Sequence, residues 1–219
     1  MNIREIRELF LSALDIVLPR KERTVRAESR TLNDLTISPK THDACGIQIT
    51  TLLDYKNPAV EDCIRALKYD GSSRASELLA EALADYLREQ IAEARSFSPR
   101  PVLLVPIPLH RKRRLERGFN QMESVLKKLP REFQDGTLAT LAPRALARTR
   151  ATKQQTRLAR AERLQNVAGA FSVADERLVQ ETLVFLIDDV TTTGATLAES
   201  SRPLSQSGAI VSALALARA

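Results

Sequence analysis

The chain of 219 residues is long enough for one well-buried α/β domain with a modest extension, and it is too short for two domains of full size. Its 33 Lys and Arg residues exceed its 27 Asp and Glu residues, and the net charge of +6 favours anionic partners such as phosphorylated sugars, nucleotides or nucleic acid. Two cysteines, Cys45 and Cys63, lack the number and spacing of a zinc site or a disulfide framework, so we expect a reduced, cytoplasmic setting.

Residues 1–42 are expected to form an N-terminal extension of the main domain. Residues 1–19 carry apolar side chains at helical spacing, but charges interrupt every apolar run well short of the roughly 20 residues that a bilayer helix needs. This pattern predicts an amphipathic helix and no membrane span. Residues 19–41 become polar and charged, which predicts an extended connection or a poorly ordered linker. The main domain is therefore expected to cover residues 43–219.

The first elements of the main domain are predicted to be a strand and two helices. Alternating apolar residues indicate a strand over residues 45–51, Pro58 begins a helix that stops at Gly71, and a second helix covers about residues 73–94. Both helices are expected to pack on the core. Lys68 and Tyr69 are the exceptions, because they close the first helix directly before the glycine turn and are candidates to face a site.

The next predicted strand, residues 102–108, is apolar throughout and ends in prolines, which turn its end into an irregular loop. Residues 109–121 then bring together several Arg and Lys side chains. A cationic loop at the carboxyl end of a buried strand can neutralise a highly charged group such as pyrophosphate. Pro108, Leu109 and Arg117 are the residues expected to face that group. Beyond this loop, the sequence predicts a helix over residues 120–129 and short strands at 144–150 and 169–173.

The most informative stretch is residues 182–197. Its first half, residues 183–187, is a continuous apolar run rich in β-branched and aromatic side chains, as in a strand buried on both faces of a parallel sheet. Asp188 and Asp189 follow where this strand should end. The next residues suit a hydroxyl-lined turn and the start of a helix, and they are Val190, Thr191, Thr192, Thr193, Gly194, Ala195 and Thr196.

This order of residues predicts a phosphate-binding turn beside an acidic pair. The helix N-terminus and the threonine hydroxyls can hold a phosphate, whereas Asp188 and Asp189 can accept hydrogen bonds from sugar hydroxyls. A ribose 5-phosphate satisfies both halves. The stretch resembles the signature of type I phosphoribosyltransferases, which grip the 5-phosphate of phosphoribosyl pyrophosphate in such a turn. The resemblance implies an α/β fold with a mainly parallel central sheet flanked by helices, preceded here by the N-terminal helical extension.

The same resemblance implies a reaction in which a nucleophile attacks C1 of the ribose and pyrophosphate leaves, with Mg²⁺ bridging pyrophosphate and ribose oxygens. Asp188 and Asp189 would be the catalytic residues, and no zinc or other protein metal site is implied. Type I phosphoribosyltransferases also carry a mobile flap, expected here at residues 150–157 with Gln155 as a ligand contact.

A narrower resemblance joins several of these segments. The runs at residues 67–71, 105–110, 117–121, 163–171 and 188–194 are similar, in family order, to the ComF family, which has a phosphoribosyltransferase fold and a genetic link to natural competence, the uptake of single-stranded DNA. Many ComF proteins begin with a cysteine-rich zinc module, and this chain has no Cys-x-x-Cys. In addition, Pro203 falls inside the helix after the phosphate-binding turn, where it is expected to kink or end that helix.

Two other functions stay open at this point. One is a single-stranded DNA-binding protein of the competence machinery that keeps the fold without turnover, which the cationic loops favour and the 4% aromatic content disfavours. The other is a sensor that binds phosphoribosyl pyrophosphate without reaction. The acceptor, the oligomeric state and the role of the extension do not follow from the sequence.

Overall fold

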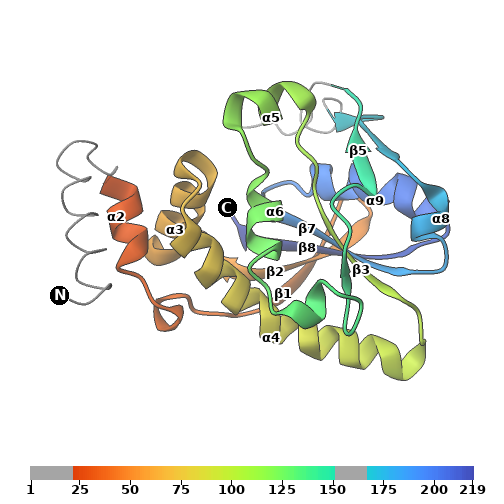
Figure 1. Cartoon of the computed structure of the whole chain (residues 1–219), viewed down its shortest axis with the longest axis horizontal. Coiled ribbons are helices and arrows are strands. Elements are labelled where there is room, and N and C mark those ends of the chain that lie inside the picture. Colours follow the sequence, from red (N-terminus) through yellow and green to blue (C-terminus); the bar gives the residue numbers. More distant parts are fainter. Residues whose placement is uncertain (1–21, 151–166) are drawn as a thin grey trace, which may run out of the picture.

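The centre of the protein is one six-stranded sheet with helices on both faces (Figure 1). The structure is a computed structural model that describes residues 22–150 and 167–219. The strands follow the order β1-β2-β8-β7-β3-β4, and every neighbouring pair is parallel except β1 and β2. A separate antiparallel pair, β5 and β6, lies beside this sheet. The predicted α/β class with a mainly parallel sheet is confirmed.

The bounds of the elements are as follows. The strands are β1 (Lys40–Ala44), β2 (Ile47–Asp54), β3 (Val102–Pro106), β4 (Thr140–Leu141), β5 (Leu146–Arg148), β6 (Phe171–Val173), β7 (Leu183–Thr191) and β8 (Ile210–Arg218). The α-helices are α2 (Glu22–Glu28), α3 (Pro58–Asp70), α4 (Ser73–Phe97), α5 (Arg111–Arg117), α6 (Gln121–Leu126), α8 (Glu176–Val179) and α9 (Ala195–Gln206). Two 3₁₀ turns, η1 (Leu32–Asp34) and η2 (Arg131–Phe133), complete the list.

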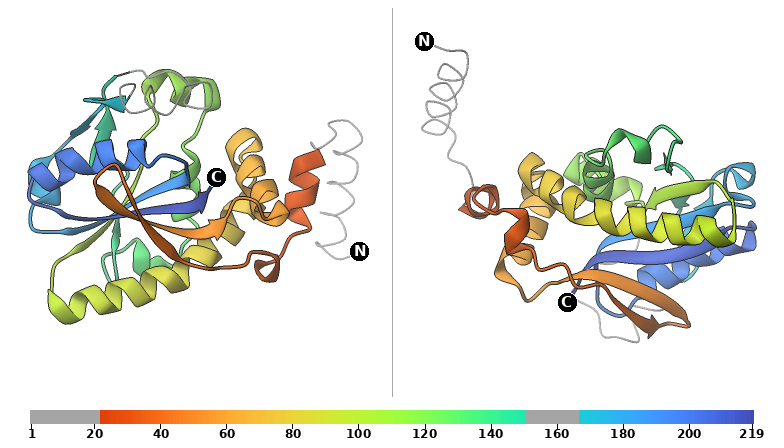
Figure 2. Two further views of the ribbon diagram at one scale, coloured as in Figure 1. Left: turned by 180° about the vertical axis from the view of Figure 1, so that it is seen from behind. Right: turned by 90° about the horizontal axis from the view of Figure 1, so that it is seen from below.

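The alternation of side chains along β7 divides the core into two layers. Phe185 and Ile187 point into a cluster with the apolar sides of α3, α4 and α6. Val184 and Leu186 point the opposite way, into a cluster with α9 and the β5–β6 pair. Figure 2 shows α4 and α9 on opposite faces of the sheet. The continuous apolar run of this strand is therefore explained by burial on both faces, as predicted.

The predicted extended connection over residues 19–41 is wrong for its described part. Residues 22–28 form α2, which packs beside α3, and both Ala27 and Leu35 are buried. Arg26 and Arg30 of this segment form ion pairs with Asp62 of α3, at 3.3 and 2.8 Å. A few buried residues within an otherwise charged sequence hold this segment against α3. So few apolar residues give the sequence little helical periodicity, which is why the helix was not predicted. The helix predicted over residues 1–19 lies outside the described residues.

Two local predictions near β1 and β3 are also corrected. Cys45 and Gly46 are the turn of a β1–β2 hairpin and not part of a strand, with φ of 53° and 81°, as a two-residue hairpin turn requires. The first strand therefore begins at Lys40, before the expected boundary at residue 43. The cationic segment after β3 is not an irregular loop throughout, because Arg111–Arg117 forms α5 between the cap His110 and Gly118 in the left-handed region.

The helix after the turn over residues 192–194 continues past its proline. Pro203 lies inside α9, which ends at Gln206. The buried side chain of Leu204 anchors this last turn to the core, and such tertiary packing compensates for the hydrogen bond that a proline cannot donate. Of the helices in the described part of the chain, none combines the length and apolar character that crossing a membrane requires.

Candidate functional site

The candidate site lies at the carboxyl ends of β7 and β3. Residues 188–191 close β7, residues 192–194 form a turn, and α9 begins at Ala195. Gly194 is the N-cap of α9 with φ of 78°, a conformation that other residues adopt only at a cost. In parallel α/β sheets, ligands bind beyond the carboxyl ends of the strands, where helix N-termini present their N–H groups.

Asp189 is buried and fully engaged by protein groups. Its side chain is 7% exposed. Its Oδ2 accepts a 2.7 Å hydrogen bond from Nε2 of Gln121 and lies 3.2 Å from Nζ of Lys68, while its Oδ1 accepts a 2.7 Å bond from the N–H of Val190. A buried carboxylate is tolerated only with such pairing. Asp189 is therefore held in one orientation by the end of α3 and the start of α6.

The same network extends to the cationic helix α5. Arg117 donates a 2.7 Å hydrogen bond to Oε1 of Gln121, so the amide of Gln121 bridges Arg117 and Asp189. Asn120 fixes the start of α6, since its Oδ1 accepts from the N–H of Met122 at 2.9 Å and its Nδ2 donates to the carbonyl of Ile107 at 3.0 Å. The residues that follow β3 are thereby tied to the acidic end of β7.

The end of α3 is positioned by a close contact with the turn before α6. Gly71 ends α3 with φ of 64°, and a Cβ at this position would lie 3.1 Å from the ring of Phe119. This approach places Lys68, in the last turn of α3, within reach of Asp189. Burial alone would lower the pKa of Lys68, but the charges of Asp189 and Asp188 raise it. Lys68 is thus a permanent cation of the site.

Asp188 differs from its neighbour. Because β7 alternates, its side chain is directed away from the face that holds Asp189, and it is half-buried. Burial and the negative charge of Asp189 raise the pKa of Asp188 to about 7. The N–H of Asp189, which donates to Oδ1 of Asp188 at 2.9 Å, and the charges of Lys68 and Arg148 only partly oppose this rise. The carboxyl of Asp188 therefore changes its charge near neutral pH.

Arg148 of β5 is a site residue that the sequence did not single out. Its guanidinium lies over the ring of Phe171, 5.2 Å from the centroid. Burial, with a contribution from the charge of Arg113, lowers the pKa of Arg148 to about 10, whereas the charge of Asp188 opposes this shift. Gln121 was likewise missed as a contact of the acidic pair. The available signals were an arginine alternating within a short strand and an amide directly after a glycine turn.

The turn after β7 is held by the β1–β2 hairpin. A Cβ at Gly194 would lie 2.6 Å from Cδ1 of Ile49 and 2.7 Å from Cβ of Ala44, so the hairpin and the turn are in close contact. The thiol of Cys45 donates to the carbonyl of Thr193 at 3.2 Å, and Oγ1 of Thr193 accepts from the N–H of Ala195 at 3.4 Å. These contacts fix the start of α9 against the sheet.

The structure brings most of the predicted site residues to one edge of the sheet. Lys68, Arg117, Asp188 and Asp189 form the connected cluster described above, and residues 190–196 continue from it. Pro108 and Leu109 are half-buried between β3 and α5. Burial lowers the pKa of Arg117, although its guanidinium stays a cation at neutral pH. Gln155 and the predicted flap beyond residue 150 lie outside the described residues.

The comparisons with known proteins identify relatives. DNA utilization protein YhgH of Escherichia coli (strain K12) is 34% identical over 164 residues, which are 74% of this chain and 67% of that protein. The chain belongs to the ComF and YhgH family. Competence protein F of Haemophilus influenzae is 31% identical over 146 residues, 66% of this chain and 61% of its own length. Competence protein ComFC of Streptococcus pneumoniae is 28% identical over 167 residues, 76% and 66% of the two chains.

Other comparisons add little to this assignment. No protein-family model matches this member of the ComF and YhgH family. Among solved structures, an orotate phosphoribosyltransferase of Mycobacterium tuberculosis H37Rv is 13% identical, covers 89% of this chain and 82% of its own, and superposes with a TM-score of 0.33. That superposition is too loose to decide the fold.

Proposed function

We propose that this chain binds phosphoribosyl pyrophosphate at the carboxyl ends of β7 and β3. The observation that carries the proposal is the acidic pair Asp188–Asp189, set between a hydroxyl-lined helix N-terminus and the cations Lys68, Arg117 and Arg148. An isolated phosphate would need only the cations and the helix. A ligand that carries phosphates on both sides of a ribose explains the carboxylates as well.

Each part of the ligand has a matching part of the site. The 5-phosphate is expected at the turn over residues 192–196, where α9 presents its N–H groups and its positive end. The ribose hydroxyls are expected to donate to Asp188. The pyrophosphate is expected to face Arg117 and Lys68, which border the end of β3.

The donor set fits Mg²⁺ carried by the ligand and not a dedicated protein cage. Among the described residues, no three His, Cys, Asp or Glu side chains converge, so Asp188 and Asp189 are the hard oxygen donors at this edge. Asp189 is already occupied by Gln121 and Lys68, which leaves Asp188 to hold a metal-bound water. When bound, Mg²⁺ would supply positive charge that offsets the pyrophosphate.

Transfer of the phosphoribosyl group is the reaction that we propose for the bound ligand. Its transition state would carry positive charge on the ribose and negative charge on the leaving pyrophosphate. Lys68 and Arg117 would stabilise the leaving group, and the ionised form of Asp188 would stabilise the ribose. None of these residues is a nucleophile in this proposal, so positioning and charge neutralisation account for the chemistry.

Isothermal titration calorimetry with phosphoribosyl pyrophosphate and Mg²⁺ tests the binding proposal. We expect binding by the wild type, and we expect Asp188→Asn with Asp189→Asn to weaken the affinity by about tenfold or more, because two charged hydrogen-bond acceptors are lost. The matched control is Asp85→Asn with Asp43→Asn, which removes the same charge from exposed positions. Absence of binding by the wild type, or equal binding by both double variants, would refute the proposal. Release of pyrophosphate on addition of candidate bases would then separate an enzyme from a sensor.

The second candidate function is binding of single-stranded DNA along α5. Arg111, Lys112 and Arg114 are exposed on this helix, and the side chain of Leu115 is 75% exposed. Relatives are named for DNA utilization and competence. Fluorescence anisotropy with labelled oligothymidylate over a salt series tests this function. Arg111→Gln with Lys112→Gln should weaken binding and reduce the salt slope by about 0.7 per lost phosphate contact, and an unchanged slope would exclude α5 as the contact.

A further inference from the structure

A pocket of about 750 Å³ lies beside the carboxyl ends of β2 and β8, and none of its residues belongs to the site described above. Three cations of different elements line it: Lys40 from β1, Lys56 from the turn after β2 and Arg218 from β8. The complete lining consists of Thr36, Ser38, Lys40, Thr51, Leu53, Asp54, Lys56, Asn57, Arg218 and Ala219. This volume falls within the range of pockets that hold small molecules.

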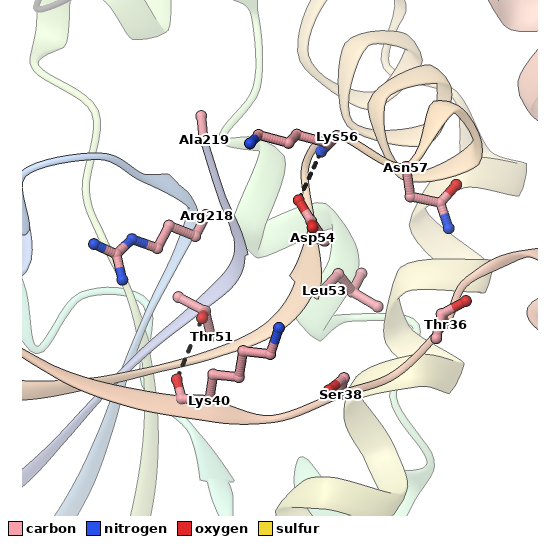
Figure 3. A pocket seen from close by; sticks show the side chains of 10 residues that line it. All are labelled: Thr36, Ser38, Lys40, Thr51, Leu53, Asp54, Lys56, Asn57, Arg218 and Ala219. Atoms are coloured by element: carbon pink, nitrogen blue, oxygen red, sulfur yellow. Dashed lines mark hydrogen bonds between the residues drawn. The ribbon is translucent and has the colours of Figure 1, made fainter.

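The side chains of this pocket are directed by the ends of the strands. Figure 3 shows Lys40 extending from β1 toward Leu53 and Asp54, and Lys56 extending back across the end of β2 toward Ala219. Arg218 extends to the side of β7. Asp54 is the one side-chain carboxylate of the lining, and it accepts from the N–H of Lys56 at 2.9 Å. Within residues 22–150 and 167–219, none of the three cations forms an ion pair.

Two further features favour an anion in this pocket. Asn57 is the N-cap of the 13-residue helix α3, so the positive end of this helix begins at the pocket wall. The hydroxyls of Thr36 and Ser38 add neutral donors to the lining. Leu53 is the one large apolar side chain in the lining, and no aromatic side chain offers a stacking surface for a flat ring. The lining residues therefore favour a charged ligand over an aromatic one.

We propose that this pocket is a second binding site, for a small organic polyanion that carries two or more carboxylate or phosphate groups. Its location connects it with the first site. Arg218 is paired in register with Thr191 at the end of β7, and the N–H of Ala219 donates to the carbonyl of Thr191 at 3.1 Å. A polyanion held by Lys40 and Lys56, next to the backbone of Arg218, thus lies one strand away from the turn after β7. The proposal does not depend on the identity of the ligand in that turn.

Calorimetry of the full chain with citrate, and separately with inorganic pyrophosphate, tests this site. We expect both anions to bind the wild type. Lys40→Gln with Lys56→Gln should lower the affinity for citrate at least tenfold, because each neutralised lysine removes a charged donor. The control variant, Lys127→Gln with Lys128→Gln, loses the same charge from exposed positions outside the pocket and should bind citrate as the wild type does.

A variant of the first site, at the acidic pair, distinguishes binding at the two sites. Arg117→Gln should weaken the binding of pyrophosphate at the acidic pair and leave the affinity for citrate unchanged. No citrate binding by the wild type at millimolar concentration, or the same loss in the pocket variant and the control variant, would overturn the second site. If citrate binds as expected while phosphoribosyl pyrophosphate does not, the second site stands and the proposed function fails.

Discussion

Replacement of Gly194 by alanine tests whether the β1–β2 hairpin holds the turn after β7. The new Cβ would lie 2.6 Å from Cδ1 of Ile49 and 2.7 Å from Cβ of Ala44, far inside van der Waals contact. Relief of such a clash inside a packed core costs about 1–3 kcal/mol. The left-handed backbone at φ of 78° adds a further penalty of about 1 kcal/mol for any residue with a Cβ.

Gly118→Ala is the matched control for this substitution. Gly118 has φ of 82°, but a Cβ there meets nothing within 4 Å, so it should show the backbone penalty alone. Urea denaturation at neutral pH should therefore place Gly194→Ala about 1–3 kcal/mol below Gly118→Ala in the free energy of unfolding, at unchanged m-value.

A second substitution checks the origin of the loss at Gly194. Adding Ile49→Val removes Cδ1, so the double variant should lose less than the sum of the two single variants. Equal stability of Gly194→Ala and Gly118→Ala would refute the contact between the hairpin and the turn. Strict additivity with Ile49→Val would remove Ile49 from the explanation.

Four other substitutions test the acidic cluster by urea denaturation. The raised pKa of Asp188 means that ionisation of this carboxyl opposes folding. Asp188→Asn should therefore increase the free energy of unfolding at pH 8, on the order of 2 kcal/mol, and this gain should disappear as the pH falls from 7 to 4. An equal gain at pH 8 and pH 4 would contradict this reasoning. Gln121→Leu should cost about 1–3 kcal/mol by leaving Asp189 with one partner fewer, and Gln121→Glu should cost more at pH 8 than at pH 4. Asn120→Ala removes a helix cap and should cost about 1–2 kcal/mol, so an unchanged midpoint would argue against the cap.

The sequence was most informative where the signal is contiguous. The apolar run of β7, the acidic pair and the hydroxyl-lined turn follow one another without interruption, and each has a local physical reason to occur in that order. The strand is longer than expected, because β7 continues through Asp188 and Asp189 to Thr191. Pairing with β8 as far as Arg218 explains this extension, since a neighbouring strand satisfies the backbone beyond the apolar run.

Contacts between distant segments could not be predicted from local patterns. Gln121 and Asp189 are 68 residues apart, and their hydrogen bond depends on how α6 lies beside β7. The helix α5 was missed for a different reason. Its sequence has no apolar stripe, so its ends decide its existence through the cap at His110 and the left-handed Gly118.

The two adjacent carboxylates of β7 have different environments, and the alternation of the strand is the cause. Asp189 turns to the face of α3 and α6, where Lys68 and Gln121 occupy it. Asp188 turns to the other face, where its Oδ1 accepts a 2.9 Å hydrogen bond from the N–H of Asp189, but burial and the charge of Asp189 still raise its pKa. Asp189 is therefore occupied by protein side chains, and Asp188 is the carboxylate that we propose to contact the ligand. The corresponding expectation is that Asp189→Asn lowers both stability and ligand affinity, whereas Asp188→Asn lowers affinity while it raises stability at pH 8; a parallel loss in both variants would contradict this division.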